Sequence, residues 1–187
     1  MDPHVHMEEL MMRKAGFLLA LILLLSGVAA AQQTPQFEIF GGYSRFLADL
    51  NTTSFSLNGA HVSAAENLNH WFGGVLDFSS NWGANAGYNI NTQSIMYGPR
   101  FAYRKSRFIT PSVHALFGGI RGSAEFDGIS KPNWRFALGV GGAIDVRIND
   151  RVAIRLVQAD YMPTRFLNLR QDNLRVSAGF VFLLPHW

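Results

Sequence analysis

The sequence predicts an all-β chain that closes into an eight-stranded antiparallel up-and-down transmembrane β-barrel, preceded by a cleavable signal peptide. Three observations lead to this fold class. They are an apolar leader that ends in small residues, eight segments in which apolar and other residues alternate, and connections that alternate between short and long. Alternation with a period of two is the pattern of a β-strand, whose successive side chains point to opposite faces.

The leader has the pattern of a secretory signal peptide. Arg13 and Lys14 precede an apolar run over residues 15–28, and three alanines ending at Ala31 follow it. A run of about 14 residues is shorter than the roughly 20 that a membrane-spanning helix needs. We therefore expect cleavage after Ala31, with retention as a membrane anchor as the alternative.

The chain is expected to divide into an N-terminal extension with the signal peptide, residues 1–31, and one β-barrel domain, residues 32–187. The true start is open among Met1, Met11 and Met12. The formal net charge of +3 is small and scattered, which does not favour nucleic acid as a partner. There is no cysteine, so no disulfide supports this exported domain.

Eight segments alternate in the manner of strands, at residues 36–48, 59–67, 71–80, 93–104, 108–123, 135–148, 151–165 and 173–184. Tilted strands of about 9–11 residues cross a bilayer. In each segment one face carries large apolar residues, whereas the other carries small or charged residues that would make a poor hydrophobic core. The pattern predicts a barrel with its apolar residues facing lipid. These residues include, in strand order, Phe37 and Ile39, Val62, Phe72 and Leu76, Ile95 and Tyr97, Val113 and Phe117, Leu138 and Val140, Ile154 and Leu156, and Phe180 and Phe182.

Two places depart from a regular strand. Pro99 and Pro111 lie inside predicted strands, where each removes a hydrogen-bond donor, so we expect a bulge or a strand start at each. By strict alternation Gln158 and Asp160 would face lipid. Either a bulge shifts them to the interior, or this stretch lies above the membrane.

The connections differ in length at the two ends of the predicted barrel. Short ones cover residues 68–70, 105–107 and 149–150, and longer ones, rich in Asn, Gly, Asp and Ser, cover residues 49–58, 81–92, 124–133 and 166–172. Bacterial outer-membrane barrels have tight periplasmic turns and longer external loops. We therefore expect both ends of the chain in the periplasm.

Aromatic residues gather near both predicted membrane boundaries, which favours interfacial girdles over core packing. One group comprises Trp71, Phe72, Tyr103, Phe108 and Phe182, and the other Trp82, Phe126 and Trp134.

Several motifs together resemble a known family, the bacterial outer-membrane β-barrel domain family, in the small single-domain form of the OmpA-type transmembrane barrel. In order they read FEIFGGYSRF, WFGGVLDFS, YGPRFAYR, TPSVHALFGG, ALGVGGAIDVRI, VAIRLVQADYMPTRF and NLRVSAGFVF, and they span nearly the whole mature chain. The ending Ser177-x-Gly179-x-x-Phe182-x-Leu184 is similar to the signal that barrel-assembly machinery recognises, although the family usually stops on an aromatic residue and this chain continues to Trp187. The resemblance implies an outer-membrane barrel with a structural, adhesive, protective or permeability role.

The lumen is expected to hold a structural polar network. In an eight-stranded barrel the interior is just wide enough for side chains to fill it, and buried charges of both signs must pair there. We therefore predict a largely plugged polar lumen, with a small passive channel for ions or small solutes as the alternative. The predicted network residues are Glu38, Asp77, Arg100, His114, Arg135, Asp145, Arg147, Arg155 and Arg175.

No catalytic, cofactor or metal site is predicted. A lipid-modifying enzyme is the rival class, and its only nearby constellation is His61, placed near the outer end of its strand, with Ser54, Ser56 or Asp49; a polar loop explains these residues equally well. An exported lipid-binding barrel is a further alternative. The expected partners are outer-membrane lipid and the export and barrel-assembly machinery, the expected state is a monomer, and the sequence does not identify a surface ligand.

Overall fold

The computed structural model describes residues 34–49, 54–85, 88–126, 129–130, 133–166 and 169–184. The predicted signal peptide, its cleavage site and the candidate start residues lie outside this part of the chain. The strands are β1 (Phe37–Asp49), β2 (Ser54–Asn67), β3 (Phe72–Asn85), β4 (Tyr88–Ala102), β5 (Ile109–Phe126), β6 (Ile129–Ser130), β7 (Asn133–Arg147), β8 (Val152–Phe166) and β9 (Leu169–Leu184).

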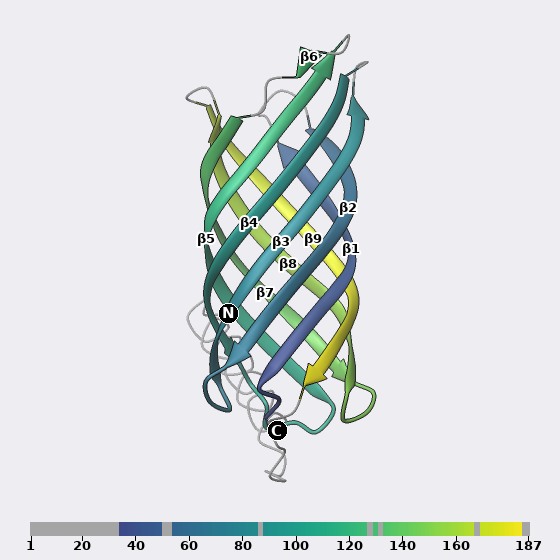
Figure 1. The fold of residues 1–187 in the computed structure, drawn as a ribbon, viewed down its shortest axis with the longest axis vertical. Coiled ribbons are helices and arrows are strands. Elements are labelled where there is room, and N and C mark those ends of the chain that lie inside the picture. Colours follow the sequence, from purple (N-terminus) through teal and green to yellow (C-terminus); the bar gives the residue numbers. More distant parts are fainter. Residues whose placement is uncertain are drawn as a thin grey trace, which may run out of the picture.

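The strands form one closed antiparallel barrel (Figure 1). Each long strand pairs with its neighbours in the chain, and the ring closes between β1 and β9. The short β6 pairs with the end of β5 and is not one of the eight strands of the ring. This confirms the predicted eight-stranded up-and-down barrel. Within the described residues no helix has the length and hydropathy to cross a membrane.

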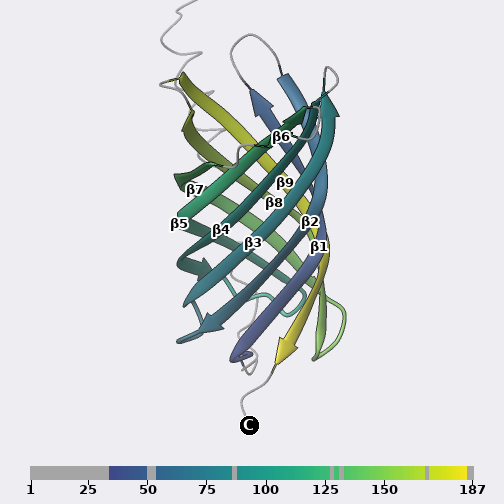
Figure 2. The same cartoon turned by 45° about the horizontal axis from the view of Figure 1, so that its top comes forward.

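The two ends of the barrel differ in what they carry. One, which we call the turn end, holds the connections at residues 68–71, 103–108 and 148–151, together with the start of β1, which pairs with the end of β9 as Phe37↔Leu184. The opposite end, the loop end, carries β6 (Figures 1 and 2).

Most residues expected in long loops at the loop end belong to strands instead. The β3–β4 ladder, for example, continues to the pair Asn85↔Tyr88, and the β8–β9 ladder to Phe166↔Leu169. The prediction of long loops was wrong there because we recognised strands by their apolar face. The hydrogen bonds of a ladder join backbone groups, so the strands continue where no apolar face is present. The strands therefore run well past the length that a bilayer needs.

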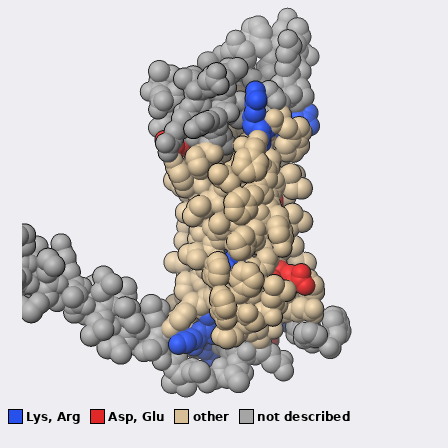
Figure 3. Space-filling model, turned by 90° about the vertical axis from the view of Figure 1, so that its left-hand side faces the viewer, with Lys and Arg blue, Asp and Glu red and all other residues tan. Residues whose placement is uncertain are grey.

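The outer surface is apolar over most of its height, as predicted. Large side chains such as Phe136 and Val140 are 69% and 63% exposed, whereas Phe40 and Val181 on the opposite face are at most 1% exposed. Figure 3 shows a largely uncharged belt on one face, with Lys and Arg toward both ends.

The irregular positions have distinct causes. At Pro99 the ladder to β3 is continuous and the register to β5 is unchanged, but the pairs at Gly98 and Pro99 are missing on the β5 side. The expected bulge or strand start is therefore wrong at Pro99, where only the donor is lost. Pro111 does lie at a strand start, since β5 begins at Ile109.

Strand β8 contains the bulge that was one of the two expected explanations. Its pairing with β9 passes from Arg155↔Gly179 to Gln158↔Ser177, so two residues of β8 oppose one of β9. The bulge turns Gln158 and Asp160 into the barrel, where both are buried.

Candidate functional site: the interior of the barrel

Arg175 of β9 lies at the centre of the interior and binds two carboxylates. It donates two hydrogen bonds to Asp77 on β3, at 2.8 and 3.0 Å, and two to Asp160 on β8, at 2.9 and 2.8 Å. All three side chains are at most 1% exposed. A planar guanidinium suits this double fork because it presents five donors in fixed directions.

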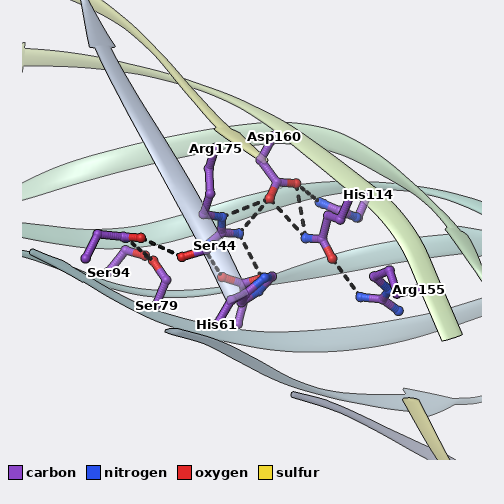
Figure 4. Close-up of polar contacts among 11 residues, drawn as sticks. Ser44, His61, Ser79, Ser94, His114, Arg155, Asp160 and Arg175 are labelled. Carbon is purple, nitrogen blue, oxygen red and sulfur yellow. Dashed lines mark hydrogen bonds and ion pairs between the residues drawn. The ribbon is translucent and has the colours of Figure 1, made fainter. Parts of the chain in front are cut away.

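Each of these aspartates also meets a histidine. His61 Nε2 lies 2.7 Å from Asp77 Oδ2, and His114 Nε2 lies 2.7 Å from Asp160 Oδ1. Figure 4 shows both imidazoles beside the Arg175 cluster. The arrangement His–Asp–Arg–Asp–His thus joins strands β2, β3, β5, β8 and β9 across the lumen.

A second cluster lies toward the turn end, around Glu38. Arg100 Nη1 donates to Glu38 Oε2 and Arg104 Nη2 to Glu38 Oε1, both at 2.6 Å. Asp145 accepts two hydrogen bonds from Arg155, at 2.7 and 3.0 Å, and a longer one from Arg100 at 3.5 Å. Arg155 also lies over the Phe40 ring, 4.5 Å from its centroid.

Gln158 connects the two clusters. It accepts a hydrogen bond from Arg155 at 2.6 Å and donates to both oxygens of Asp160, at 3.2 and 3.0 Å. The joined set, which we call the lumen network, balances four carboxylates against four guanidinium groups. These are Glu38, Asp77, Asp145 and Asp160 with Arg100, Arg104, Arg155 and Arg175.

Two residues expected in this network stand apart from it. Arg135, near the loop end of β7, is exposed, and Arg147 is only half-buried. Arg147 lines a small cavity at the turn end with Glu38, Arg104 and Asp145. Alternation assigns a face to each residue but not its height along the barrel, and near the ends an inward side chain meets solvent.

The position expected for His61 was wrong. It lies in the middle of β2, which begins at Ser54, and it is fully buried against Asp77 rather than near the outer rim. Ser56 faces outward, where its hydroxyl accepts a hydrogen bond from Arg45. Ser56 therefore does not form the expected constellation with His61. The side chains of Asp49 and Ser54 lie outside the described residues.

Sequence reasoning also missed an apolar part of the interior. Phe46, Leu57, Met96, Leu116, Ile120 and Met162 are all at most 4% exposed and pack in one cluster. A Cβ placed on Gly139 of β7 would touch Leu116, Met162 and Met96 at 3.6–3.7 Å, so side chains from β5, β8 and β4 surround this glycine. The lumen is therefore filled by a polar and an apolar layer.

Little space remains between these side chains. Two cavities beside the lumen network, lined by described residues, measure about 10 Å³ each, close to the smallest volume that holds one water molecule. In the described part of the chain the acidic and imidazole groups form no cluster of three or more suited to a metal ion.

A closed barrel with an apolar outer belt, aromatic residues near both boundaries and a filled polar interior defines a small outer-membrane barrel protein. Residues 17–182 match the model of the outer membrane protein beta-barrel domain, and the chain belongs to that family. It is a protein of the bacterial outer membrane. A search of curated proteins gave no match.

Solved structures with similar folds are small outer-membrane barrels. Neisserial surface protein A has a TM-score of 0.70 and 16% identity, covering 80% of this chain and 97% of its own. Ail, the attachment invasion locus protein of Yersinia pestis, has a TM-score of 0.59 and 17% identity, covering 80% and 99%. OprG from Pseudomonas aeruginosa has a TM-score of 0.54 and 11% identity, covering 83% and 98%. At these identities the likeness concerns the fold.

Proposed function

We propose that this protein is an outer-membrane barrel with a closed lumen, which acts through its external surface and its contact with lipid rather than by conducting solutes or by catalysis. The filling of the interior by ion pairs and an apolar cluster is the observation that supports this proposal. The turn end is proposed to face the periplasm, because the start of β1 and the end of β9 lie there and such barrels keep both ends of the barrel segment in the periplasm.

Conductance recordings test the closed lumen. The purified protein in planar bilayers is expected to give no stepwise current. Replacing Met96, Leu116 and Met162 together by serine removes the apolar cluster at Gly139 but leaves the ion pairs in place, so this variant is also expected to give no stepwise current. Stepwise, ion-selective openings in the unmodified protein would overturn the proposal in favour of a passive channel.

A surface-interaction role has support from a structural neighbour and from charge. Ail has been solved in complex with the heparin analogue sucrose octasulfate. In the present chain Arg45 and Arg135, both in the loop-end halves of their strands, are exposed. Calorimetric titration with sucrose octasulfate is expected to show salt-sensitive binding that weakens in R45Q/R135Q, and an unchanged affinity in that variant would argue against these arginines.

A further inference from the structure

A groove of about 360 Å³ opens on the outer surface at the turn end, between β4 and β5. Its lining is almost entirely apolar and includes Trp71, Phe101, Ala102, Tyr103, Pro111 and Val113. It lies on the lipid-facing side of the wall, separate from the lumen network.

The groove follows from the way the two strands end. The β4–β5 ladder stops at Ala102↔Ser112, and beyond it Tyr103 N donates one more hydrogen bond to Pro111 O, at 2.9 Å. Pro111 has no N–H to return. The ladder therefore ends where the connection at residues 103–108 begins, and the groove lies at this point.

Aromatic rings fix one wall of the groove. Trp71 and Phe101 stack with centroids 5.8 Å apart and planes inclined by 18°, and Phe72 packs against both at 5.6 and 5.2 Å. Packed rings lose little conformational freedom when a ligand binds beside them, which favours a preformed apolar site.

Two cationic side chains stand in the connection that begins at Tyr103, a residue that lines the groove. Lys105 and Arg107 are both exposed, and Lys105 Nζ lies 5.8 Å from the centroid of the Tyr103 ring. Arg104 is not available to a ligand in the same way, because it binds Glu38 inside the barrel. Lys and Arg side chains also gather at the lower end of the face in Figure 3.

We propose that this groove binds one anionic phospholipid of the surrounding membrane, with an acyl chain between Trp71 and Val113 and the phosphate at Lys105 and Arg107. The apolar walls suit a hydrocarbon chain, whereas the paired cations favour a headgroup with a net negative charge over a zwitterionic one. The site depends on the outer-membrane setting and is independent of whether the lumen conducts.

Fluorescence quenching by brominated lipid tests the proposal. Trp82 and Trp134 are each 53% exposed, so W82F/W134F/W187F leaves Trp71 as the sole tryptophan without removing a buried side chain that the structure describes. The protein is reconstituted in mixed phosphatidylcholine and phosphatidylglycerol vesicles, with bromine on the acyl chains of one lipid at a time. The relative binding constant is expected to favour phosphatidylglycerol by roughly thirtyfold, as two nearby cations imply.

Variants separate the two parts of the site. K105Q/R107Q should bring the phosphatidylglycerol preference to about one, whereas R151Q should keep it, because Arg151 is equally exposed in another connection at the same end. V113F should reduce quenching by both lipids by filling the groove, and V62F, exposed on the outer face of β2, should not.

Equal quenching by the two lipids in the parent protein would overturn the proposal. A phosphatidylglycerol preference that survives K105Q/R107Q would overturn it too, because the selectivity would then arise elsewhere. Conductance recordings on the same samples report separately on the closed lumen, so failure of one proposal is distinguishable from failure of the other.

Discussion

Arg175 is the residue on which the interior depends most. Among the described residues, its guanidinium alone forms ion pairs with both Asp77 and Asp160. Its positive charge does not depend on the protonation of His61 or His114. A buried carboxylate left without its partner cannot regain water, and removal of one member of a buried ion pair is therefore strongly destabilising.

Replacement of Arg175 by methionine is expected to lower the free energy of unfolding by about 3–5 kcal/mol, the usual cost of stranding buried charges. Urea unfolding in lipid vesicles measures the change. The control, R151M, alters an exposed cation and should change stability by less than about 0.5 kcal/mol. If R175M does not fold, R175K is measured instead, because lysine retains the positive charge. The loss of stability in R175K should lie between those of R151M and R175M. A loss below about 1 kcal/mol in R175M would contradict a central role.

Glycines of the interior face differ in the space around them. A Cβ on Gly98 would collide with the backbone oxygen of Ala115 and approach Leu116 Cα at 3.1 Å, whereas one on Gly139 would make ordinary contacts at 3.6–3.7 Å. We expect G98A to cost about 1–3 kcal/mol through overpacking. G139A should be neutral or stabilising by up to about 1 kcal/mol. Denaturant midpoints of the two variants, compared in the same vesicles, check the order; equal midpoints would contradict it.

At this scale, alternation predicted the inward face of Glu38, Asp77, Arg100, Asp145 and Arg155 from the sequence. Two kinds of information were missing. Which charges meet depends on the stagger between strands far apart in sequence, and which inward residues are exposed depends on their height in the barrel. Asp160 was assigned to either face because a bulge, unlike a strand, has no repeating pattern.

Among the elements, β8 shows how one extra residue decides a face. Leu156 and Val157 both point outward, and after them Gln158 and Asp160 are buried. The pairing of β8 with β7 and its pairing with β9 both shift by one residue at this pair. Without the extra residue in an otherwise regular strand, every later side chain would change faces.

Deletion of Leu156 is expected to be tolerated, because it converts the two-against-one pairing into one-to-one pairing while Arg155 and Gln158 keep their inward positions. Deletion of Leu138 from the regular β7 should instead prevent folding, since it moves the residues on one side of it to the wrong face. Heat-modifiable gel mobility of the refolded proteins distinguishes the two. Equal loss of the folded band in both deletions would show that the bulge itself is required.

Strand ends near the turn end were predicted within a few residues, because apolar alternation and turn residues coincide there. Toward the loop end the predicted strands stopped too early. Asn81 and Thr92 were assigned to a connection, yet they pair with each other across β3 and β4 and both are buried. Polar residues in a paired strand outside lipid have the composition of a loop, so composition alone did not separate the two.

For the molecule as a whole, the outer belt matches the height of a membrane. From Phe72 to Trp82 along β3, a rise of about 3.3 Å per residue and a tilt of roughly 40° give about 25 Å along the barrel axis. This equals the usual height of the apolar band in such barrels. Leu76 and Phe78 lie midway and are 49% and 46% exposed.

The cost of a charge on the outer face should therefore depend on its depth. L76R, near the middle of the belt, is expected to lower stability by about 2–4 kcal/mol, whereas W82R at the boundary should cost about 0–1 kcal/mol. Urea unfolding in vesicles gives both values. In detergent micelles the difference should shrink, because a micelle adapts its thickness. A larger cost for W82R than for L76R would mean that the belt sits elsewhere on the barrel.

The position of Arg175 on β9, the last strand, also bears on how the chain reaches its closed form. In a flat sheet of the same strands, with β9 not yet joined to β1, Arg175 and Asp77 would lie on strands separated by β8, β7, β5 and β4. Only when the two sheet edges join does the guanidinium reach the distant carboxylate. An open or wrongly joined sheet leaves Asp77 without this guanidinium. The ion pair between Arg175 and Asp77 therefore adds its stabilisation to the closed barrel and to no partly joined form.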